Sequence, residues 1–357
     1  ASDCLVSDIC GGCSLRHMHP DQQLDMKQEM LLDLLKRATG LTRNDFELLP
    51  KLAAGSSHYR RKARLAVRYV QKKGGALVGF REKRSSFITV MDDCQILVGE
   101  VSQLIIGLKS LISNLSSAAD IPQIEVAVGE TEPGLGAPLQ VALVFRHLKP
   151  LTSADQGALI QFAAKHRVHC YLQPEGPDTV YRIYPHMGEE RLAYFLPDQD
   201  VQLMFHPMDF TQIHGPMNRR IVARVVELMS VEPGETLLDL FCGLGNFTLP
   251  LAKCGAYVAG VEGSKVMVER GYENADLNGL KQLEFYCADL FKPLDDAEWA
   301  QRGYEKILLD PPRSGALEVV QQIGRFSPKK IVYVSCNPAT LARDSGELLA
   351  QGYQLKS

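Results

Sequence analysis

The C-terminal part of the sequence alternates apolar, strand-forming runs with stretches of helical length, and this restricts the chain to few folds. The runs are 236–241, 257–262, 283–289, 306–310 and 330–335. Helices are expected to begin at Asn246, at Ser264 and at about Asp295, and to follow the last two runs. Apolar strands separated by helices form doubly wound, mostly parallel sheets. Residues 201–357 are therefore predicted to be a Rossmann-like α/β domain.

Residues 1–200 have a different pattern, which predicts a separate α+β domain. A glycine- and cysteine-rich start precedes a helix whose apolar face includes Met26, Met30 and Leu34 and which ends at Gly40. The segment 61–98 alternates as strands do, with the runs 64–70 and 87–90 on either side of a Gly-Gly turn at 74–75. Further strand signals lie at 124–128, 139–145 and 179–184.

The composition is typical of a globular protein, with 45% hydrophobic and 23% charged residues in 357. No run of about eighteen apolar residues is present, and the first residues lack the pattern of a secretion signal. We therefore expect a cytoplasmic protein with no membrane partner. Nothing in the sequence indicates an obligate protein partner.

A basic stretch at 58–84 interrupts an otherwise acidic chain of formal net charge -3. Glu82 is its single acid, and Tyr59, Tyr69 and Phe80 lie among its cations. Cations mixed with aromatic rings are typical of surfaces that bind phosphates and bases. The candidate contacts are Arg60, Arg61, Lys62, Arg81, Lys83 and Arg84. A solvated strand face is the alternative interpretation.

The nine cysteines are unevenly placed, and Cys4, Cys10 and Cys13 crowd the start of the chain. In a reducing compartment such a cluster indicates metal or redox chemistry rather than disulfides.

Side chains suited to a nucleoside follow the first strands of the α/β domain. The loop 239–247 contains Gly243 and Gly245, which let the backbone approach a ligand closely. Glu262 ends the next strand, where it can accept hydrogen bonds from ribose hydroxyls, and Asp289 ends the third, where it can accept from an adenine amino group. No Gly-Lys-Ser/Thr motif binds phosphates here, which favours S-adenosylmethionine over a nucleotide. Solvated loop acids are the alternative.

The last two strands end in D310-P-P-R-S-G and V334-S-C-N-P. The prolines hold the chain extended and present Asp310 and Arg313 at the rim of the sheet. Cys336 lies at the same edge, although a thiol at a strand end also packs well as a small apolar group.

These motifs, D239-L-F-C-G-L-G-N-F-T, D310-P-P-R-S-G and V334-S-C-N-P-A-T-L-A-R-D344, resemble the RNA uracil-C5 methyltransferase family. The cysteine-rich start resembles its RumA-type branch, which modifies 23S ribosomal RNA. The resemblance implies a class I S-adenosylmethionine-dependent methyltransferase fold with Cys336 as nucleophile. It places Phe210 and Gln212 beside the target base, with Asp310 at the uracil edge. The residues implied at the cofactor are Gln212, Phe241, Asn246, Glu262, Asp289 and Asp310.

A thiol suits this reaction. Addition of a thiolate to C6 of uracil makes C5 nucleophilic enough to take a methyl group, and loss of the C5 proton then releases the thiolate. The base must be unstacked to reach such a pocket. The chain holds no match to the segment in which the family carries the glutamate expected to remove that proton, or to the small β-barrel that usually precedes the cysteines.

The same resemblance supplies Cys94 as a fourth ligand beside Cys4, Cys10 and Cys13, and implies a [4Fe-4S] cluster. Four thiolates also suit zinc, and ordinary buried thiols remain a third interpretation. Two other function classes share features with this one. A methyltransferase acting on transfer RNA would have the same catalytic domain, and a non-catalytic RNA-binding protein would have the basic stretch without needing Cys336.

Overall fold

A computed structural model describes residues 4–134, 136–294 and 297–357. The chain forms two compact units, which are described separately. The first contains residues up to 20, 54–195 and 204–218, and the second contains 21–53, 196–203 and 219–357. The expected linear division near residue 200 thus differs from the compact units, because 21–53 and 204–218 each join the other part of the chain.

The first unit is built on a six-stranded sheet in the order β2-β1-β3-β4-β5-β6, in which only β4 and β5 pair in parallel. Alternate residues of β1 are buried, as in Ala63, Leu65 and Val67, while Arg64 and Arg68 are exposed. The strands are β1 (Lys62–Val70), β2 (Gly75–Gly79), β3 (Gln123–Glu130), β4 (Leu139–Arg146), β5 (His169–Gln173) and β6 (Tyr181–Tyr184). The helices are α2 (Gly99–Ser102), α3 (Leu104–Ser113) and α4 (Ser153–His166).

The hairpin predicted around residues 74–75 is confirmed, but its second strand is not the one expected. Gly74 and Gly75 have φ values of 81° and 139°, which favour glycine, and they connect β1 to β2. The run 87–90 is not a strand, and there the prediction was wrong: Ile88 makes only an isolated bridge to Arg81. The backbone turns back at Arg84, whose φ is 56°, and the bridge is flanked by two hydrogen bonds, from Glu82 to Phe87 and from Thr89 to Phe80, both at 2.9 Å.

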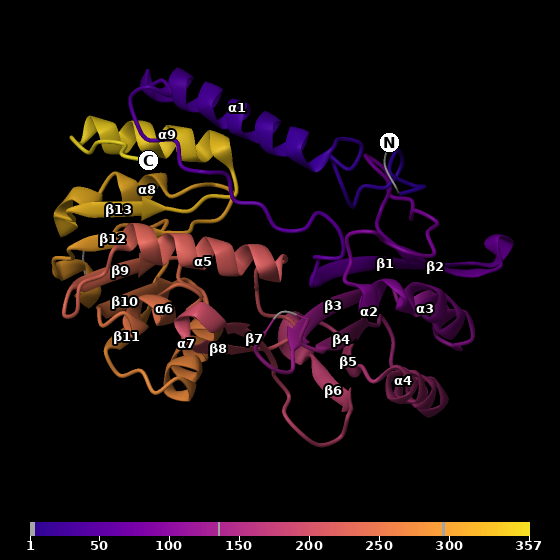
Figure 1. Cartoon of the computed structure of the whole chain (residues 1–357). Coiled ribbons are helices and arrows are strands. Elements are labelled where there is room, and N and C mark those ends of the chain that lie inside the picture. Colours follow the sequence, from indigo (N-terminus) through magenta and orange to yellow (C-terminus); the bar gives the residue numbers. More distant parts are fainter. Residues whose placement is uncertain (1–3, 135, 295–296) are drawn as a thin grey trace. The chain divides into compact units, whose positions relative to one another are not determined.

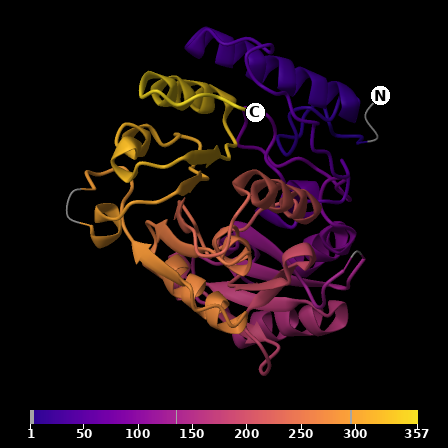
Figure 2. The ribbon, with the colours of Figure 1, turned by 60° about the vertical axis from the view of Figure 1, so that its left-hand side comes forward.

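The second unit contains a five-stranded, entirely parallel sheet in the order β11-β10-β9-β12-β13 (Figures 1 and 2). Its strands are β9 (Thr236–Leu240), β10 (Tyr257–Glu262), β11 (Leu283–Cys287), β12 (Lys306–Leu309) and β13 (Lys330–Tyr333). All five predicted strands are therefore present, and the doubly wound fold is confirmed. The strand order reverses direction at β9, which makes the ends of β9 and β12 the expected ligand site.

In the second unit, a helix follows each described strand of the parallel sheet except β11. These helices are α6 (Thr248–Lys253), α7 (Lys265–Leu277), α8 (Leu317–Val320) and α9 (Pro338–Ala350), and α5 (Gly215–Met229), which begins in the first unit, precedes β9. The start of the helix expected at about Asp295 lies outside the described residues, and the part that follows contains only a 3-10 helix at Glu298–Gln301. Trp299 of this turn stacks on Phe326 with ring centroids 6.0 Å apart and fills the core beneath β12.

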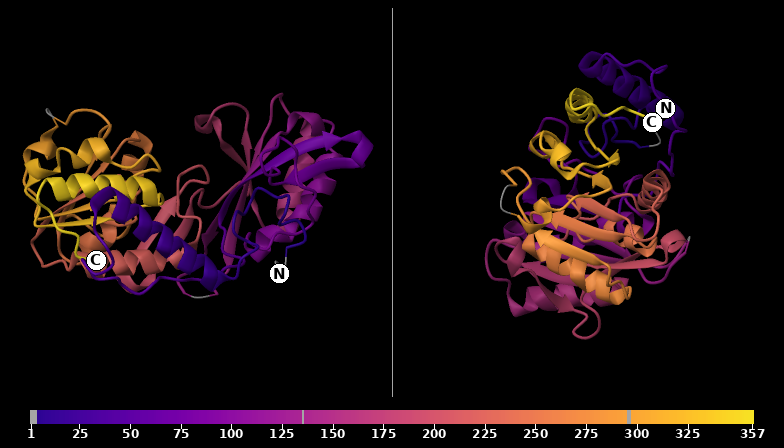
Figure 3. Two further views of the ribbon diagram at one scale, coloured as in Figure 1. Left: turned by 90° about the horizontal axis from the view of Figure 1, so that it is seen from above. Right: turned by 90° about the vertical axis from the view of Figure 1, so that its left-hand side faces the viewer.

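The predicted N-terminal helix is α1 (Pro20–Thr39), and it lies beside α9 (Figures 1, 2 and 3). A Cβ added at Gly346 of α9 would lie 3.4 Å from the carbonyl oxygen of Ala38. Gly40 ends the helix with a φ of 76°, and its amide donates to the carbonyl of Lys36 at 2.9 Å. β7 (Leu192–Leu196) and β8 (Val201–Phe205) form a separate two-stranded sheet. None of the helices in the described ranges has the length and apolar character needed to cross a bilayer.

Candidate functional site

The loop after β9 is folded back onto the neighbouring strand β10. The amides of Phe241 and Cys242 both donate to the carbonyl of Val261, at 2.9 and 3.1 Å. Phe241 has a φ of 66°, and Gly243 has a φ of 56°. A non-glycine residue in this region is held there by its surroundings, as is common at ligand sites. The predicted cofactor loop is therefore a fixed turn at the reversal point of the sheet.

Glu262 at the end of β10 is oriented by two backbone amides. One carboxylate oxygen accepts from Gly243 at 3.2 Å and the other accepts from Ser264 at 2.9 Å. Each oxygen keeps a free lone pair in this arrangement, because a carboxylate oxygen accepts two hydrogen bonds. The side chain thus joins the glycine loop to the start of α7 and remains able to accept from a diol.

Asp239 is fully buried in β9, and Asp310 is half-buried directly after the adjacent strand β12. Burial raises the pKa of Asp239 to about 7 and that of Asp310 to about 6. One oxygen of Asp239 accepts from the hydroxyl of Thr248 at 2.6 Å, and within the described part of the chain the other is buried without a partner. An unpaired buried carboxylate oxygen is costly, and a bound donor would remove that cost.

Asp289 and Phe241 lie at the ends of β11 and β9. Asp289 is exposed, accepts from the amide of Phe291 at 3.1 Å and pairs with Lys292 at 3.3 Å. The hydrogen bond from Phe291 holds the pKa of Asp289 below its usual value. The ring of Phe291 lies 5.7 Å from that of Phe241, at an interplanar angle of 51°. Asn246 is half-buried and lies between Gly245 and α6.

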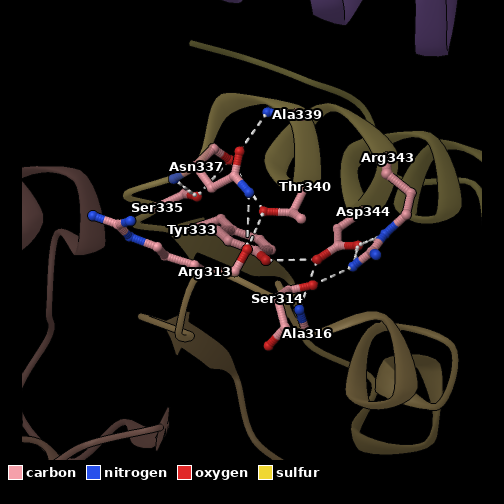
Figure 4. A network of polar contacts seen from close by, with 10 residues as sticks. All are labelled: Arg313, Ser314, Ala316, Tyr333, Ser335, Asn337, Ala339, Thr340, Arg343 and Asp344. Carbon is pink, nitrogen blue, oxygen red and sulfur yellow. Dashed lines mark hydrogen bonds and ion pairs between the residues drawn. The ribbon is translucent and has the colours of Figure 1, made fainter. Parts of the chain in front are cut away.

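Cys336 is exposed at the end of β13, and the residues on both sides of it are fixed by hydrogen bonds (Figure 4). The side-chain oxygen of Asn337 accepts from the amide of Ala339 at 3.1 Å and caps α9, with Pro338 as the first helical residue. The Asn337 amide group donates to the carbonyl of Arg313 at 2.9 Å. The Ser335 hydroxyl accepts from the Asn337 amide at 3.1 Å. The thiol therefore projects from a rigid turn.

A second set of contacts holds the D310-P-P-R-S-G loop against α9. Asp344 is fully buried and accepts from the Tyr333 hydroxyl at 2.6 Å, from the Ala316 amide at 2.8 Å and from the Arg343 guanidinium at 2.7 Å. The guanidinium of Arg343 also donates to the carbonyl of Ser314 at 3.0 Å. The Arg313 side chain extends away from this network (Figure 4). Asp344 thus connects β13, α9 and the loop after β12.

Phe210 and Gln212 belong to the first unit, in the segment 204–218. Phe210 is 71% exposed, and Gln212 is half-buried. The structure thus brings Phe241, Asn246, Glu262, Asp289, Asp310 and Cys336 to strand ends of the second unit.

The four cysteines of the predicted metal site line one pocket of the first unit. Cys4, Cys10, Cys13 and Cys94 share this lining with Val6, Phe80, Met91 and Ile96. Burial, and then the proximity of Cys94, Cys10 and Cys4, raises the pKa of Cys13. The amide of Gly12 donates to the sulfur of Cys10 at 3.4 Å. Over the described ranges, no three His, Cys, Asp or Glu side chains are arranged to hold a metal ion, so the pocket by itself does not show a metal.

The six candidate RNA contacts fall into two groups in the structure. Arg81, Lys83 and Arg84 are exposed in the turn beside the cysteine-rich loop, where Lys83 donates to the carbonyl of Ser7 at 2.8 Å. Arg60, Arg61 and Lys62 are half-buried at the start of β1 and are engaged within the unit. The guanidinium of Arg60, for example, lies 5.5 Å from the ring centre of Phe80.

Comparison with known proteins is consistent with these strand-end motifs. Residues 186–354 match the family model described as tRNA (Uracil-5-)-methyltransferase. The 23S rRNA (uracil(1939)-C(5))-methyltransferase RlmD of Hahella chejuensis is 50% identical over 357 residues, which cover 99% of this chain and 78% of that protein. The RlmD of Alcanivorax borkumensis is 49% identical over 99% of this chain and 77% of its own length. The chain belongs to the RlmD family of 23S rRNA (uracil-C5)-methyltransferases.

A solved structure agrees with the fold of this RlmD-family chain. The tRNA (uracil-54, C5)-methyltransferase of Pyrococcus abyssi, in complex with S-adenosyl-L-homocysteine, is 25% identical, with a TM-score of 0.68 over 96% of this chain and 80% of that one. The predicted family and the class I methyltransferase fold are confirmed.

Three residues that the structure places at the candidate site were assigned no role from the sequence. Asp239 is the first residue of the glycine-rich motif, but its burial was not evident from its neighbours. Phe291 follows Asp289 by two residues, and this spacing was the available signal. Asp344 ends the last motif and was quoted without a role, because two of its partners, Tyr333 and Ala316, lie 11 and 28 positions away in the chain.

Proposed function

We propose that this chain transfers a methyl group from S-adenosylmethionine to C5 of a uridine in 23S ribosomal RNA, the one that its relatives' name numbers 1939. The observation that carries the proposal is the exposed thiol of Cys336, fixed by Asn337 and Arg313 at the same sheet edge as Asp310 and Glu262. A buried thiol would have contradicted it. The second unit provides the catalytic domain, the first unit binds RNA, and the ribosomal substrate makes the protein cytoplasmic.

The acids at the strand ends fit the cofactor. Glu262, whose carboxylate is held by the amides of Gly243 and Ser264, is proposed to accept from the ribose. Asp289, which accepts from the amide of Phe291, is proposed to accept from the adenine amino group. The unpaired oxygen of Asp239 and the left-handed turn at Gly243 add a buried acceptor and a close backbone approach. The proposed cofactor contacts also include four residues that match family positions near S-adenosylmethionine: Gln212, Phe241, Asn246 and Asp310. When bound, S-adenosylmethionine supplies an electrophilic methyl group.

The chain's own residues activate the pyrimidine. The Cys336 thiolate forms a bond to C6 of uracil, which places the electron pair on the C4 carbonyl system and makes C5 nucleophilic. After C5 is methylated, its proton leaves to a base, the electron pair returns, and the C6–sulfur bond breaks. Asp310, with its raised pKa, is suited to hydrogen-bond the uracil edge, while Phe210 and Gln212 contact the base.

Trapping on 5-fluorouridine RNA tests this chemistry, because fluorine replaces the proton that must leave. A 23S fragment that contains 5-fluorouridine, incubated with the protein and S-adenosylmethionine, should form a covalent complex with the parent protein and none with Cys336→Ala. Methyl incorporation into 23S RNA and into transfer RNA is compared in parallel. Transfer RNA as the better substrate would favour the activity of the Pyrococcus relative, and absence of any adduct would favour a non-catalytic RNA-binding protein.

We propose in addition that Cys4, Cys10, Cys13 and Cys94 hold a [4Fe-4S] cluster. The support is a shared pocket lined by all four thiols and by apolar side chains, with a backbone amide directed at one sulfur. Thiolates in such surroundings bind soft metals or clusters. The proposed role of the cluster is structural, because it would join the N-terminal loop to the segment that follows the turn 81–87.

The RNA surface of the first unit is proposed to centre on Arg81, Lys83 and Arg84. Phe87, on the same turn, is 64% exposed, and its carbonyl accepts from the amide of Glu82 at 2.9 Å. Ile9 lies beside this turn at Lys83, whose amide donates to the Ile9 carbonyl at 2.8 Å, and Ile9 is 52% exposed. An exposed ring among cations is suited to stack an unpaired base while the cations contact phosphates.

A further inference from the structure

The start of β1 is attached to the segment Met208–His214, which carries Phe210 and Gln212. Both belong to the first unit. The amide of Arg61 donates to the carbonyl of Ile213 at 2.8 Å, and Arg60 forms an antiparallel bridge with His214. Two backbone segments far apart in sequence are therefore joined at the end of the segment nearest α5.

The other end of the segment is held by a side chain. The Lys62 ammonium donates to the carbonyl of Asp209, immediately before Phe210. The turn that precedes it is closed by Asp209, whose amide donates to the carbonyl of His206 at 2.9 Å and whose carboxylate accepts from the His206 amide at 2.7 Å. Burial lowers the pKa of Lys62 to about 8, which indicates an ammonium largely withdrawn from water.

Arg61 is withdrawn from solvent as well. Its guanidinium pairs with Glu130 at 2.5 Å, and the two side chains are 14% and 1% exposed. The second oxygen of Glu130 accepts from the amide of Phe195 at 3.1 Å. A Cβ at Gly215 would lie 2.6 Å from the guanidinium carbon, so the backbone after the segment is packed directly on Arg61. A cation so occupied has little surface left for an RNA phosphate.

Tyr59 completes the contact through its ring. Tyr59 and His214 stack with centroids 4.4 Å apart and planes inclined by 10°. One ring nitrogen of His214 lies 2.9 Å from the carbonyl of Gly55, and the other accepts from the amide of Met217 at 3.2 Å. His214 is therefore fixed on both edges and on one face.

From these contacts we infer that Tyr59, Arg61 and Lys62 are positioning residues that clamp the backbone of Met208–His214, rather than contacts to RNA. The backbone is held at Asp209, Ile213 and His214, while the Phe210 side chain between them is exposed. A fixed backbone that presents one free ring is pre-organised to receive a base at low entropic cost. The inference rests on the proposed function only for the identity of that base.

The test compares three lysine-to-methionine variants of the full chain, which remove one charge each and keep the length of the side chain. Lys62→Met removes the clamp, Lys83→Met removes an exposed cation of the proposed RNA surface, and Lys165→Met removes an exposed cation of α4. Hydrogen exchange of the peptide 208–214, kcat and KM for methyl transfer, and the salt dependence of RNA binding are measured for each. Lys62→Arg serves as the conservative variant, because it restores a donor.

Lys62→Met should speed exchange in 208–214 and lower kcat about tenfold or more, with RNA affinity within about twofold of the parent and an unchanged salt slope. Lys62→Arg should recover most of both losses. Lys165→Met should match the parent, whereas Lys83→Met should weaken RNA binding and lower its salt slope without speeding exchange in 208–214. Tyr59→Ser removes the stacking on His214 together with some packing against the core, and it should also speed exchange. It keeps the test available if Lys62→Met does not accumulate.

Unchanged exchange and kcat in both Lys62→Met and Tyr59→Ser would overturn the clamp. A reduced salt slope in Lys62→Met, equal to that of Lys83→Met, would return Lys62 to the RNA contacts. Exchange reports on the clamp whether or not the protein is active, whereas absence of methyl transfer by the parent would contradict the proposed function alone.

Discussion

The side-chain amide of Asn337 donates a hydrogen bond to the main-chain carbonyl of Arg313 at 2.9 Å, and its oxygen caps α9. The residue after the candidate nucleophile thus ties the loop following β12 to the turn following β13. The cap and the tie use different atoms of one side chain, so substitution can separate them.

Asn337→Asp should keep the cap and lose the tie, because a carboxylate accepts from Ala339 but cannot donate to Arg313. We expect nearly unchanged thermal stability and a lower rate of adduct formation on 5-fluorouridine RNA. Asn337→Ala should lose both and be destabilised by about 1 kcal/mol as well. If both variants form the adduct at the parent's rate, the tie does not position Cys336.

Asp310 should make the protein less stable as pH rises. Burial raises its pKa to about 6 from the ordinary 3.8, so the folded chain holds this proton more tightly than the unfolded chain does. The stability due to the proton is present at low pH and is lost as pH increases from about 4 through about 6. Asp310→Asn does not titrate, and above pH 6 it should be the more stable protein, by at most about 3 kcal/mol.

Urea unfolding of Asp310→Asn and the parent at several pH values between about 4 and 7 measures this difference, which should shrink as the pH falls from about 6 to about 4. Methyl transfer should be strongly reduced in the same variant. A stability difference that does not depend on pH would show that Asp310 titrates normally.

The turn 81–87 should contribute to the free energy of RNA binding in two separable ways, by phosphate contacts and by base stacking. Lys83→Met removes a phosphate contact and should lower the slope of log affinity against log salt concentration by about 0.7 to 0.9. Phe87→Leu removes base stacking and should weaken binding by about 1–3 kcal/mol at every salt concentration. Fluorescence titration of a 23S fragment at several salt concentrations distinguishes the two. Curves of both variants that coincide with that of the parent would place the RNA elsewhere.

Metal analysis tests the cysteine pocket. Anaerobically purified protein should contain about four iron and four acid-labile sulfide per chain, as a [4Fe-4S] cluster requires. Cys94→Ser should lose both, whereas Cys254→Ser, which lies in the second unit, should keep them. One zinc per chain and no sulfide would replace the cluster with a zinc site, and no metal at all would leave ordinary thiols.

The parallel sheet was predictable because each strand has a local signal in the sequence: an apolar run followed by a polar residue at its carboxyl end. The strand ends Glu262, Asp289, Asp310 and Cys336 were found in this way, since parallel strands bring their ends to one edge. The network around Asp344 was not predictable, because hydrogen bonds between separate loops produce no periodic pattern in the sequence.

At the start of β1, the sequence suggested a function for residues whose structural role it could not show. Arg60, Arg61 and Lys62 have the composition of an RNA-binding strand, and only their partners reveal a second role. Glu130 and Asp209 are 69 and 147 residues away from the cations that they meet. The number of cations in this stretch shows that it needs anionic or polar partners. Only the fold shows whether those partners belong to the protein itself or to a ligand.

The pairing of α1 with α9 has a consequence for biosynthesis. The second unit contains residues 21–53 together with 219–357, and the amide of Glu47 donates to the carbonyl of Lys356 at 2.9 Å. A ribosome releases α1 long before α9, so Leu35, which is buried in the folded unit, stays uncovered while about three hundred further residues emerge. The second unit can therefore close only after the helix that follows Cys336 has been translated.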